Sequence, residues 1–503
     1  MPDPSGAICT RGVWHLWCTV IYLKSMRKLE EELNKLAKSD AYPFHMPGHK
    51  RRDADPSGGP LCAARAWDIT EIDGFDNLHD PSDLLREEME RAARFYGTKE
   101  TYFLVNGSTC GMLAAVSAAV PRGGRILMER GCHISVYHAV YMMQLEALYI
   151  EDFGAAGDWK AFENAAPFDA VVITSPTYEG LVKDVRFWSD FAHANDAALI
   201  VDEAHGAHFS LHPYFPESAV RQGADLVVQS LHKTLPSLTS TALLHNVSGR
   251  VSFSKIKRFL DIYETSSPSY LLLASITSLL HELEESGSRY FDDYVQRLQL
   301  LRGKLAGSEF IGLAGGADAR LSFDGELPGG RQGMLADPGK IVLTGADGAE
   351  LYDLLRLEYG LQPEMKGPDY VLMMTSPADS DEGFERLLRA VSEIVHQRCQ
   401  TPVVQVHQRC QAPVAQLHQR CQTPVVQMKI SEAMDAETEM VAADAAVGRI
   451  AADFVIQYPP DVPLLAPGEV ITEDLLNEIR QLKKAGFTIT GFVDDQFLCV
   501  KAR

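Results

Sequence analysis

The most constraining feature of the sequence is a lysine placed directly after a buried strand. The run 224–229 is short, apolar and rich in valine and leucine, which is typical of a strand covered on both faces. It is followed by Ser-Leu-His-Lys, ending at Lys233, and then by a polar segment interrupted by Pro236. A lysine in this place is either a surface amine on a loop or an amine held in a site to form a Schiff base. Residues elsewhere in the chain bear on this choice.

Short apolar runs recur along the chain and alternate with helical patterns such as 112–120 and 187–195. The other predicted strands are 102–105, 125–128, 147–150, 170–174, 198–201 and 242–245. Short strands that are apolar on both faces and alternate with helices predict an α/β fold with a mainly parallel sheet. Ligands of such sheets bind beyond the carboxyl ends of the strands, where this chain carries its polar clusters.

Composition restricts the class of protein. The 503 residues are enough for two or three domains, and 46% hydrophobic with 23% charged residues is ordinary for a globular chain. The net charge of −21 argues against a nucleic-acid partner. Nine cysteines without a Cys-x-x-Cys pair predict free thiols in a reducing compartment, and hence a cytoplasmic protein. No apolar run reaches the roughly 18 residues that span a membrane, so no membrane partner is expected.

The pattern divides the chain into six segments. Residues 1–25 are expected to be an extension outside the fold, because a strong helical pattern starts only after Met26. The others are an N-terminal helix and arm (26–80), a large domain (81–284), a small α+β domain (285–395), an insert (396–428) and a C-terminal domain (429–503). Strands at 320–323, 340–343 and 370–374 and a helix at 349–359 are predicted for the small domain, and a helix at 474–485 for the C-terminal domain.

The segment 396–428 repeats an 11-residue unit three times, nearly unchanged. Each unit starts with a histidine and has a cysteine three residues later, so three His and three Cys offer a possible metal site. Each unit also contains a proline, and the spacing matches no zinc motif. We therefore favour a tandem duplication that forms a flexible insert, and we expect no metal.

The polar residues at the strand ends together suit one ligand. Ser108 and Thr109 open a helix whose amides and dipole favour a phosphate, although serine is also an ordinary helix cap. Asp202 ends an apolar strand, where a buried carboxylate needs a partner such as a protonated pyridine nitrogen. His133 offers a ring for stacking, unless it is an ordinary loop histidine. With Lys233, these residues describe a pyridoxal 5'-phosphate site.

These stretches resemble the Orn/Lys/Arg decarboxylase family, and the chain is similar to its short bacterial branch without the wing domain. The resemblance lies in residues 45–49, 70–74, 106–109, 175–180, 202–205, 230–236, 267–270 and 458–460, and covers about 40–275 and 445–490. It implies a fold type I, aspartate aminotransferase-like large domain. The run Ser-x-His-Lys-Thr-Leu-Pro is the most specific of these motifs. The chain departs from the family in having Ser240 where glutamine is frequent, and in the triple repeat.

The resemblance also implies roles for single residues. Lys233 carries the cofactor as a Schiff base, Asp202 pairs with the pyridine nitrogen and His133 stacks on the ring, and these three form the catalytic set. The remaining cofactor contacts are Ser108, Thr109, Ser230 and His232 at the phosphate and His205 beside Asp202.

The implied reaction is decarboxylation of a basic amino acid, arginine first and lysine or ornithine next, with a role either in polyamine biosynthesis or in acid resistance. Glu469, in a proline-rich loop, is the candidate partner for the distal cation of the substrate, unless it is a surface acid. At least a homodimer is expected, with the loop 45–50 reaching the partner's site. The alternatives are an aminotransferase or another lyase of the same fold, or a catalytically silent member.

Overall fold

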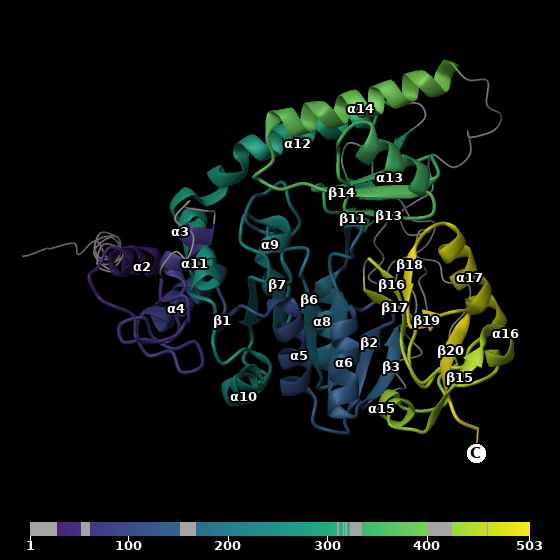
Figure 1. The fold of residues 1–503 in the computed structure, drawn as a ribbon, viewed down its shortest axis with the longest axis horizontal. Helices are drawn as coiled ribbons and strands as arrows, with labels where there is room; N and C mark the ends of the chain where they lie inside the picture. The colour runs from purple at the N-terminus through teal and green to yellow at the C-terminus, as the bar shows by residue number, and fades with distance from the viewer. Residues whose placement is uncertain are drawn as a thin grey trace, which may run out of the picture.

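The computed structural model describes residues 28–51, 61–150, 167–308, 311–314, 316, 319–321, 334–400, 425–459 and 461–502. The predicted extension 1–25 and residues 401–424 of the repeat lie outside these ranges, so the expectations for them stay predictions. The first repeat unit nevertheless begins inside a helix, because α14 (Asp381–Gln400) continues through its first five residues. The described elements form three regions, with the large domain in the centre of Figure 1.

The large domain is built on a seven-stranded sheet in the order β1-β8-β7-β6-β4-β2-β3. The strands are β1 (Glu100–Leu104), β2 (Arg125–Glu129), β3 (Glu146–Ile150), β4 (Ala170–Thr174), β6 (Ala198–Asp202), β7 (Leu226–Ser230) and β8 (Ala242–Asn246). Strands β3, β2, β4, β6 and β7 are parallel, whereas β8 is antiparallel to both β7 and β1. Strand β1 therefore runs in the same direction as β7. The predicted mainly parallel sheet is confirmed.

Alternate residues of each central strand enter two different cores, which is why these strands are apolar throughout. Val172 and Ile200 pack on the side of α5 (Gly107–Ala119), α6 (Ile134–Met143) and α10 (Phe253–Tyr263). Their neighbours Val171 and Leu199 pack on the opposite side, against α8 (Val185–Ala194). Helices thus cover both faces of the sheet, as Figure 1 shows.

Helix α4 (Leu84–Tyr96) is capped by a residue of the loop that precedes it. The carboxylate of Asp76, in the preceding loop, accepts hydrogen bonds from the backbone amides of Ser82, Asp83 and Leu85. Asp83 itself makes no side-chain cap. A carboxylate from the preceding loop can thus satisfy the free amides of a first helical turn in place of a residue at the cap position.

The small domain follows two long helices, α11 (Tyr270–Ser286) and α12 (Asp292–Leu305). Its sheet has the order β13-β14-β12-β9 and is covered by α12, α13 (Gly348–Leu357) and α14. The strands are β9 (Gly312–Leu313), β12 (Lys340–Thr344), β13 (Met365–Lys366) and β14 (Tyr370–Met374). A second sheet, β10-β11-β5, joins β10 (Arg320–Leu321) and β11 (Met334–Ala336) to β5 (Leu181–Val182) of the large domain. This junction brings the start of β12 to the edge of the large domain.

The C-terminal region has its own apolar core between two three-stranded sheets, β15-β20-β19 and β17-β16-β18. Their strands are β15 (Thr438–Ala442), β16 (Val455–Tyr458), β17 (Val462–Leu465), β18 (Thr488–Thr490), β19 (Phe492–Val493) and β20 (Gln496–Val500). The predicted amphipathic helix is α17 (Glu473–Lys484). This region, yellow in Figure 1, lies beside β2 and β3 of the large domain.

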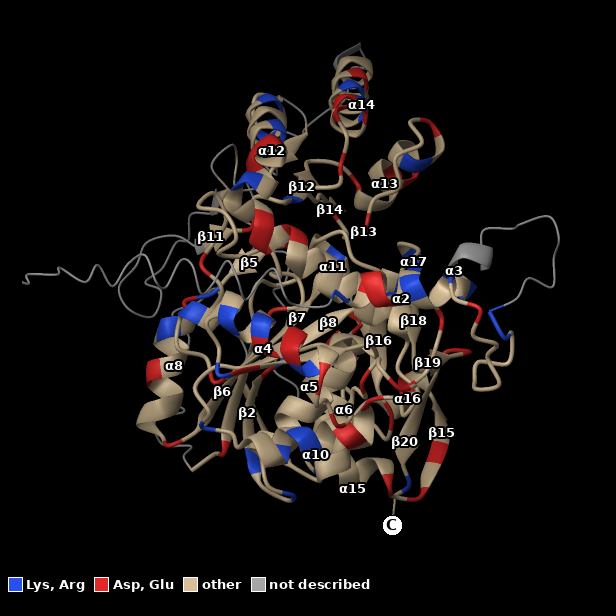
Figure 2. Cartoon of the chain, turned by 90° about the vertical axis from the view of Figure 1, so that its left-hand side faces the viewer, with Lys and Arg blue, Asp and Glu red and all other residues tan. Residues whose placement is uncertain are grey.

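Acidic and basic residues are interspersed along the helices in Figure 2, for example on α12 and α14. Among the described residues, no helix is long and apolar enough to cross a membrane. N-terminal helices α2 (Leu29–Ala37) and α3 (Leu61–Trp67) pack near α11, and the loop 40–48 that follows α2 exposes Tyr42, Phe44 and Met46.

Candidate active site

The carboxyl ends of the strands bring most of the predicted site residues to one edge of the sheet. Asp202 is the last residue of β6 and Ser230 the last of β7. Ala242 of β8 pairs with both Ser230 and Leu104, so β1 ends level with β7. The amino end of α5, with Ser108 and Thr109, follows β1 at that edge. His133 caps α6 beyond the end of β2.

Asp202 and His133 are held by hydrogen bonds to nearby backbone. Oδ1 of the buried Asp202 accepts the amide of Ala204 at 3.1 Å. Nδ1 of His133 accepts the amide of Ser135 at 3.2 Å, so a neutral His133 carries its hydrogen on Nε2. Burial lowers the pKa of His133, the charge of Asp202 opposes this, and the charge of Lys233 adds to it. These three side chains therefore share one electrostatic environment.

Lys233 lies in the short helix α9 (Leu231–Thr234), directly after β7. Its Nζ is 3.2 Å from Nε2 of His205, which belongs to the turn after β6. Burial lowers the pKa of Lys233, and the carboxylates of Asp202 and Glu364 oppose that shift. A lysine with a depressed pKa, close to a carboxylate and a histidine, is the arrangement that a reactive amine needs.

The same edge has features that fit a bound phosphate. The hydroxyl of Ser230 is completely buried and finds no hydrogen-bond partner among the described residues. Buried polar atoms in proteins are almost always paired, so an unpaired one indicates a ligand position. The first turn of α5 supplies free amides and the positive end of the helix dipole. Nδ1 of His232 donates to the carbonyl of Thr241 at 2.9 Å, which directs Nε2 away from that strand.

Comparison with known families decides the class of protein. The major-domain model described as "Orn/Lys/Arg decarboxylase, major domain" matches residues 28–315, more than half of the chain. The corresponding C-terminal domain model matches residues 413–496. The chain belongs to the Orn/Lys/Arg decarboxylase family. This confirms the resemblance seen in the sequence and the prediction of an enzyme of the decarboxylase class.

Relatives of the Orn/Lys/Arg decarboxylase family are similar over nearly the whole chain. Arginine decarboxylase of Bacillus subtilis is 28% identical over 91% of this chain and 94% of its own length. The uncharacterized protein YaaO of the same organism is 31% identical, over 90% and 94%. Among solved structures, the constitutive lysine decarboxylase of E. coli has a TM-score of 0.79 at 21% identity, covering 96% of this chain and 83% of that one. This structural likeness confirms the predicted fold.

For a member of this decarboxylase family, Glu469 has an unexpected environment. Its side chain is 1% exposed, and Oε2 accepts hydrogen bonds from Arg130 Nη2 at 2.7 Å and from the amide of Ala466 at 2.8 Å. Arg130 belongs to the large domain, just after β2. The interpretation of Glu469 as a surface acid is thus wrong, and the pairing gives it a structural role in joining two regions. A role in substrate binding stays a prediction.

Two acidic residues that sequence reasoning missed act on Lys233. The charges of Glu364 and Asp461 both oppose the lowering of the pKa of Lys233, and Asp461 also acts on His133. Asp461 follows the Tyr-Pro-Pro motif, and its carbonyl accepts the amide of Ile134. A close look at that loop would have found Asp461, because it is the acid nearest the quoted motif. Glu364 carries no such signal.

The third missed residue is Lys340, the first residue of β12 in the small domain. Its Nζ is 2.7 Å from Nδ1 of His205, on the opposite side of the ring from Lys233. In the sequence it is simply the first residue of a predicted strand. The pairing of β11 with β5 carries it to the edge of the large domain.

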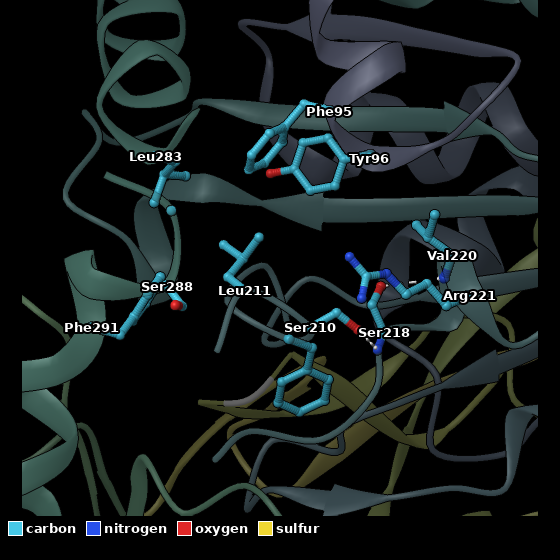
Figure 3. A pocket seen from close by; sticks show the side chains of 12 residues that line it. Phe95, Tyr96, Ser210, Leu211, Ser218, Val220, Arg221, Leu283, Ser288 and Phe291 are labelled. Carbon is cyan, nitrogen blue, oxygen red and sulfur yellow. Dashed lines mark hydrogen bonds between the residues drawn. The ribbon is translucent and has the colours of Figure 1, made fainter. Parts of the chain in front are cut away.

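A separate pocket of about 200 Å³ lies between α4, the segment 209–221 and the end of α11. Figure 3 shows the rings of Phe95 and Tyr96 on one side and the guanidinium of Arg221 on another. None of the predicted cofactor residues lines it. The predicted site residues thus lie elsewhere, in the cluster around Lys233.

Proposed function

We propose that this protein decarboxylates a basic amino acid, with arginine as the preferred substrate and pyridoxal 5'-phosphate as its cofactor, in the cytoplasm. One observation carries the proposal. Lys233 and Asp202 stand at the carboxyl ends of neighbouring parallel strands, and His133 and His205 lie within the same charged, buried cluster. The unpaired hydroxyl of Ser230 supports a phosphate at the same edge.

The residues present suit this cofactor, which when bound withdraws electrons from the bond that releases carbon dioxide. Asp202 would hold a proton on the ring nitrogen, since its buried carboxylate requires a cationic partner. Lys233 would provide the covalent attachment, and Ser108, Thr109, Ser230 and His232 would bind the phosphate. His133, with its hydrogen on Nε2, would lie against the ring.

The preference for a basic substrate is supported by charge. Asp461 and Glu364 both place negative charge near Lys233, where a substrate has to bind. A distal guanidinium or ammonium would be attracted to these carboxylates. Arginine is placed first because several relatives at 26–28% identity are named arginine decarboxylases, whereas the lysine decarboxylases are 23–24% identical.

A homodimer is part of the proposal. The loop 40–48 exposes Phe44 to 88% and Met46 to 66% of their surfaces. Adjacent large apolar side chains at this exposure are typical of an interaction surface, which fits an arm that packs on a second copy of the chain. Sedimentation measurements on the purified protein would test this state.

The proposed activity is tested by incubating the purified protein with pyridoxal phosphate and either arginine, lysine or ornithine. Release of carbon dioxide and the matching amine is expected, fastest with arginine. Lys233→Ala should abolish both release and the visible absorbance of the bound cofactor, because no other amine in the cluster is positioned at the end of β7.

Two alternatives predict different outcomes in this assay. An aminotransferase of the same fold would form a keto acid without releasing carbon dioxide, and a silent family member would bind the cofactor without turnover. Either result would contradict the decarboxylase proposal.

A further inference from the structure

His205 lies between two lysines that come from different domains. Its Nε2 is 3.2 Å from Nζ of Lys233, and its Nδ1 is 2.7 Å from Nζ of Lys340. His205 and Lys340 are buried, with 6% and 3% exposed, and Lys233 is partly buried. Each ring nitrogen of this histidine thus faces an amine.

The chemistry of the imidazole makes these two contacts unequal. Burial lowers the pKa of His205 well below its ordinary value, and the charges of Lys340, Lys233, His133 and His232 lower it further. A neutral imidazole has one N–H and one lone pair. One lysine therefore donates to the lone pair, which an ammonium does most strongly, while the other accepts the N–H and must be a neutral amine.

Two observations identify Lys340 as the ammonium. Its contact with His205 is the shorter by 0.5 Å, from 3.2 and 2.7 Å, as expected for a charge-assisted hydrogen bond. Its Nζ also lies 5.6 Å from the centre of the Tyr178 ring, where a cation is favoured over a neutral amine. The hydrogen of His205 is then on Nε2 and points to Lys233.

The protein builds a specific position for Lys340. Gly180 has φ of +99°, and a Cβ on it would lie 2.7 Å from Cγ of Lys340. A side chain at residue 180 would push Lys340 away from His205. The turn before Lys340 is fixed by Asp337, which accepts hydrogen bonds from His208 at 3.1 Å and from the amide of Gly339 at 2.8 Å.

Charged groups from several elements face this chain of contacts. Burial lowers the pKa of Lys340 to about 8. The charges of Asp337, Glu364 and Glu179 oppose this shift, and the charge of Lys233 adds to it. Burial lowers the pKa of Lys233, against Asp202, Glu364 and Asp461. Acids thus surround both amines, and His205 is the group that distinguishes them.

We propose that Lys340 is a positioning residue that fixes His205 with its hydrogen on Nε2 and thereby holds Lys233 as a neutral amine. The inference rests on the proposed function in one respect, that Lys233 is the amine that attaches the cofactor. An amine must be neutral to bond to an aldehyde, so a lysine from the small domain prepares the large domain to take up its cofactor.

The test measures the cofactor-free protein. The rate at which acetic anhydride labels Lys233 is followed against pH by mass spectrometry of the peptide that contains it. Lys340→Met frees Nε2 of His205 to accept a hydrogen bond from a Lys233 ammonium. The midpoint of labelling is therefore expected to move upward by about one pH unit or more.

A double variant separates this mechanism from simple loss of a positive charge. In a His205→Phe background, Lys340→Met should shift the midpoint much less, because only the direct repulsion between the two amines is then removed. Lys366→Met is the matched control, since Lys366 lies over the rings of Tyr352 and Phe487 instead. An equal shift in the presence and absence of His205, or no shift at all, would overturn the proposal.

A measurement on the unaltered protein avoids any loss of folding in the variants. The ¹⁵N chemical shifts of the His205 ring, assigned by their disappearance in His205→Phe, should be those of the Nε2–H form. The Nδ1–H form would refute the inference. Neither measurement depends on decarboxylation. The role of Lys340 can therefore be tested even if the protein proves to lack the proposed activity.

Discussion

At the scale of single residues, Asp461 combines a charge with an uncommon backbone conformation. Its φ is +61°, in the left-handed region where glycine, asparagine and aspartate are tolerated best. Its charge acts on Lys233 and His133. An aspartate that stays in this conformation and whose charge acts on the proposed cofactor lysine is more consistent with a function than with a simple turn.

We therefore expect Asp461→Asn to raise the KM for arginine about fivefold, which corresponds to about 1 kcal/mol of lost attraction, with less effect on kcat. Steady-state kinetics measure both quantities. Asp494→Asn is the matched control, because Asp494 has a φ of +51° but lies in the turn between β19 and β20. An unchanged KM in Asp461→Asn would exclude this residue from substrate recognition.

At the scale of elements, the position of α5 depends on Gly111. A Cβ at this residue would lie 2.7 Å from Cδ1 of Leu104 and 2.9 Å from Cγ1 of Val228. The helix can approach β1 and β7 closely only because this side chain is absent. Its amino end is thereby brought to the predicted phosphate contacts.

Gly111→Val should reduce the free energy of unfolding by about 1–3 kcal/mol through overpacking, and should weaken cofactor binding by displacing the helix. Urea unfolding and titration with pyridoxal phosphate measure the two effects. Gly303→Ala, in α12, has no atom within 4 Å of the added carbon and should be neutral or slightly stabilising. If the Gly111→Val variant is destabilised but still binds the cofactor tightly, the position of α5 does not control cofactor binding.

At the scale of the whole molecule, a buried ion pair joins the large domain to the C-terminal region. Arg130 reaches Glu469 at 2.7 Å and also donates to the carbonyl of Leu464 at 3.3 Å. Removing one partner of a buried pair is costly because the other charge stays buried. The chain between Leu464 and Glu469 is therefore fixed against the large domain.

Glu469→Gln is expected to cost about 3–5 kcal/mol and to make the C-terminal region more sensitive to limited proteolysis. Glu439→Gln is the control, since the partner of Glu439, Arg449, lies within the C-terminal region and their contact is partly exposed. A higher KM for the basic substrate without greater proteolysis would instead support the predicted contact of Glu469 with the substrate.

The sequence alone determined the features that depend on local pattern. The apolar runs before Asp202 and Lys233 predict buried strands, because a strand covered on both faces has apolar residues at every position. Parallel strands place their carboxyl ends at one edge of a sheet. The sequence therefore predicts that Asp202, Ser230 and the start of α5 lie close together at that edge. The specific run that ends at Pro236 indicated the family.

Tertiary structure alone decided the contacts between segments far apart in the sequence. Lys340 reaches His205 across 135 positions, because a small-domain strand pairs with β5. Glu469, predicted to contact the substrate unless it was a surface acid, is half of a buried ion pair, because its loop packs against the end of β2. Periodicity reports which face of an element is apolar, but it holds no information on which distant polar group a side chain will meet. That depends on how the finished domains pack.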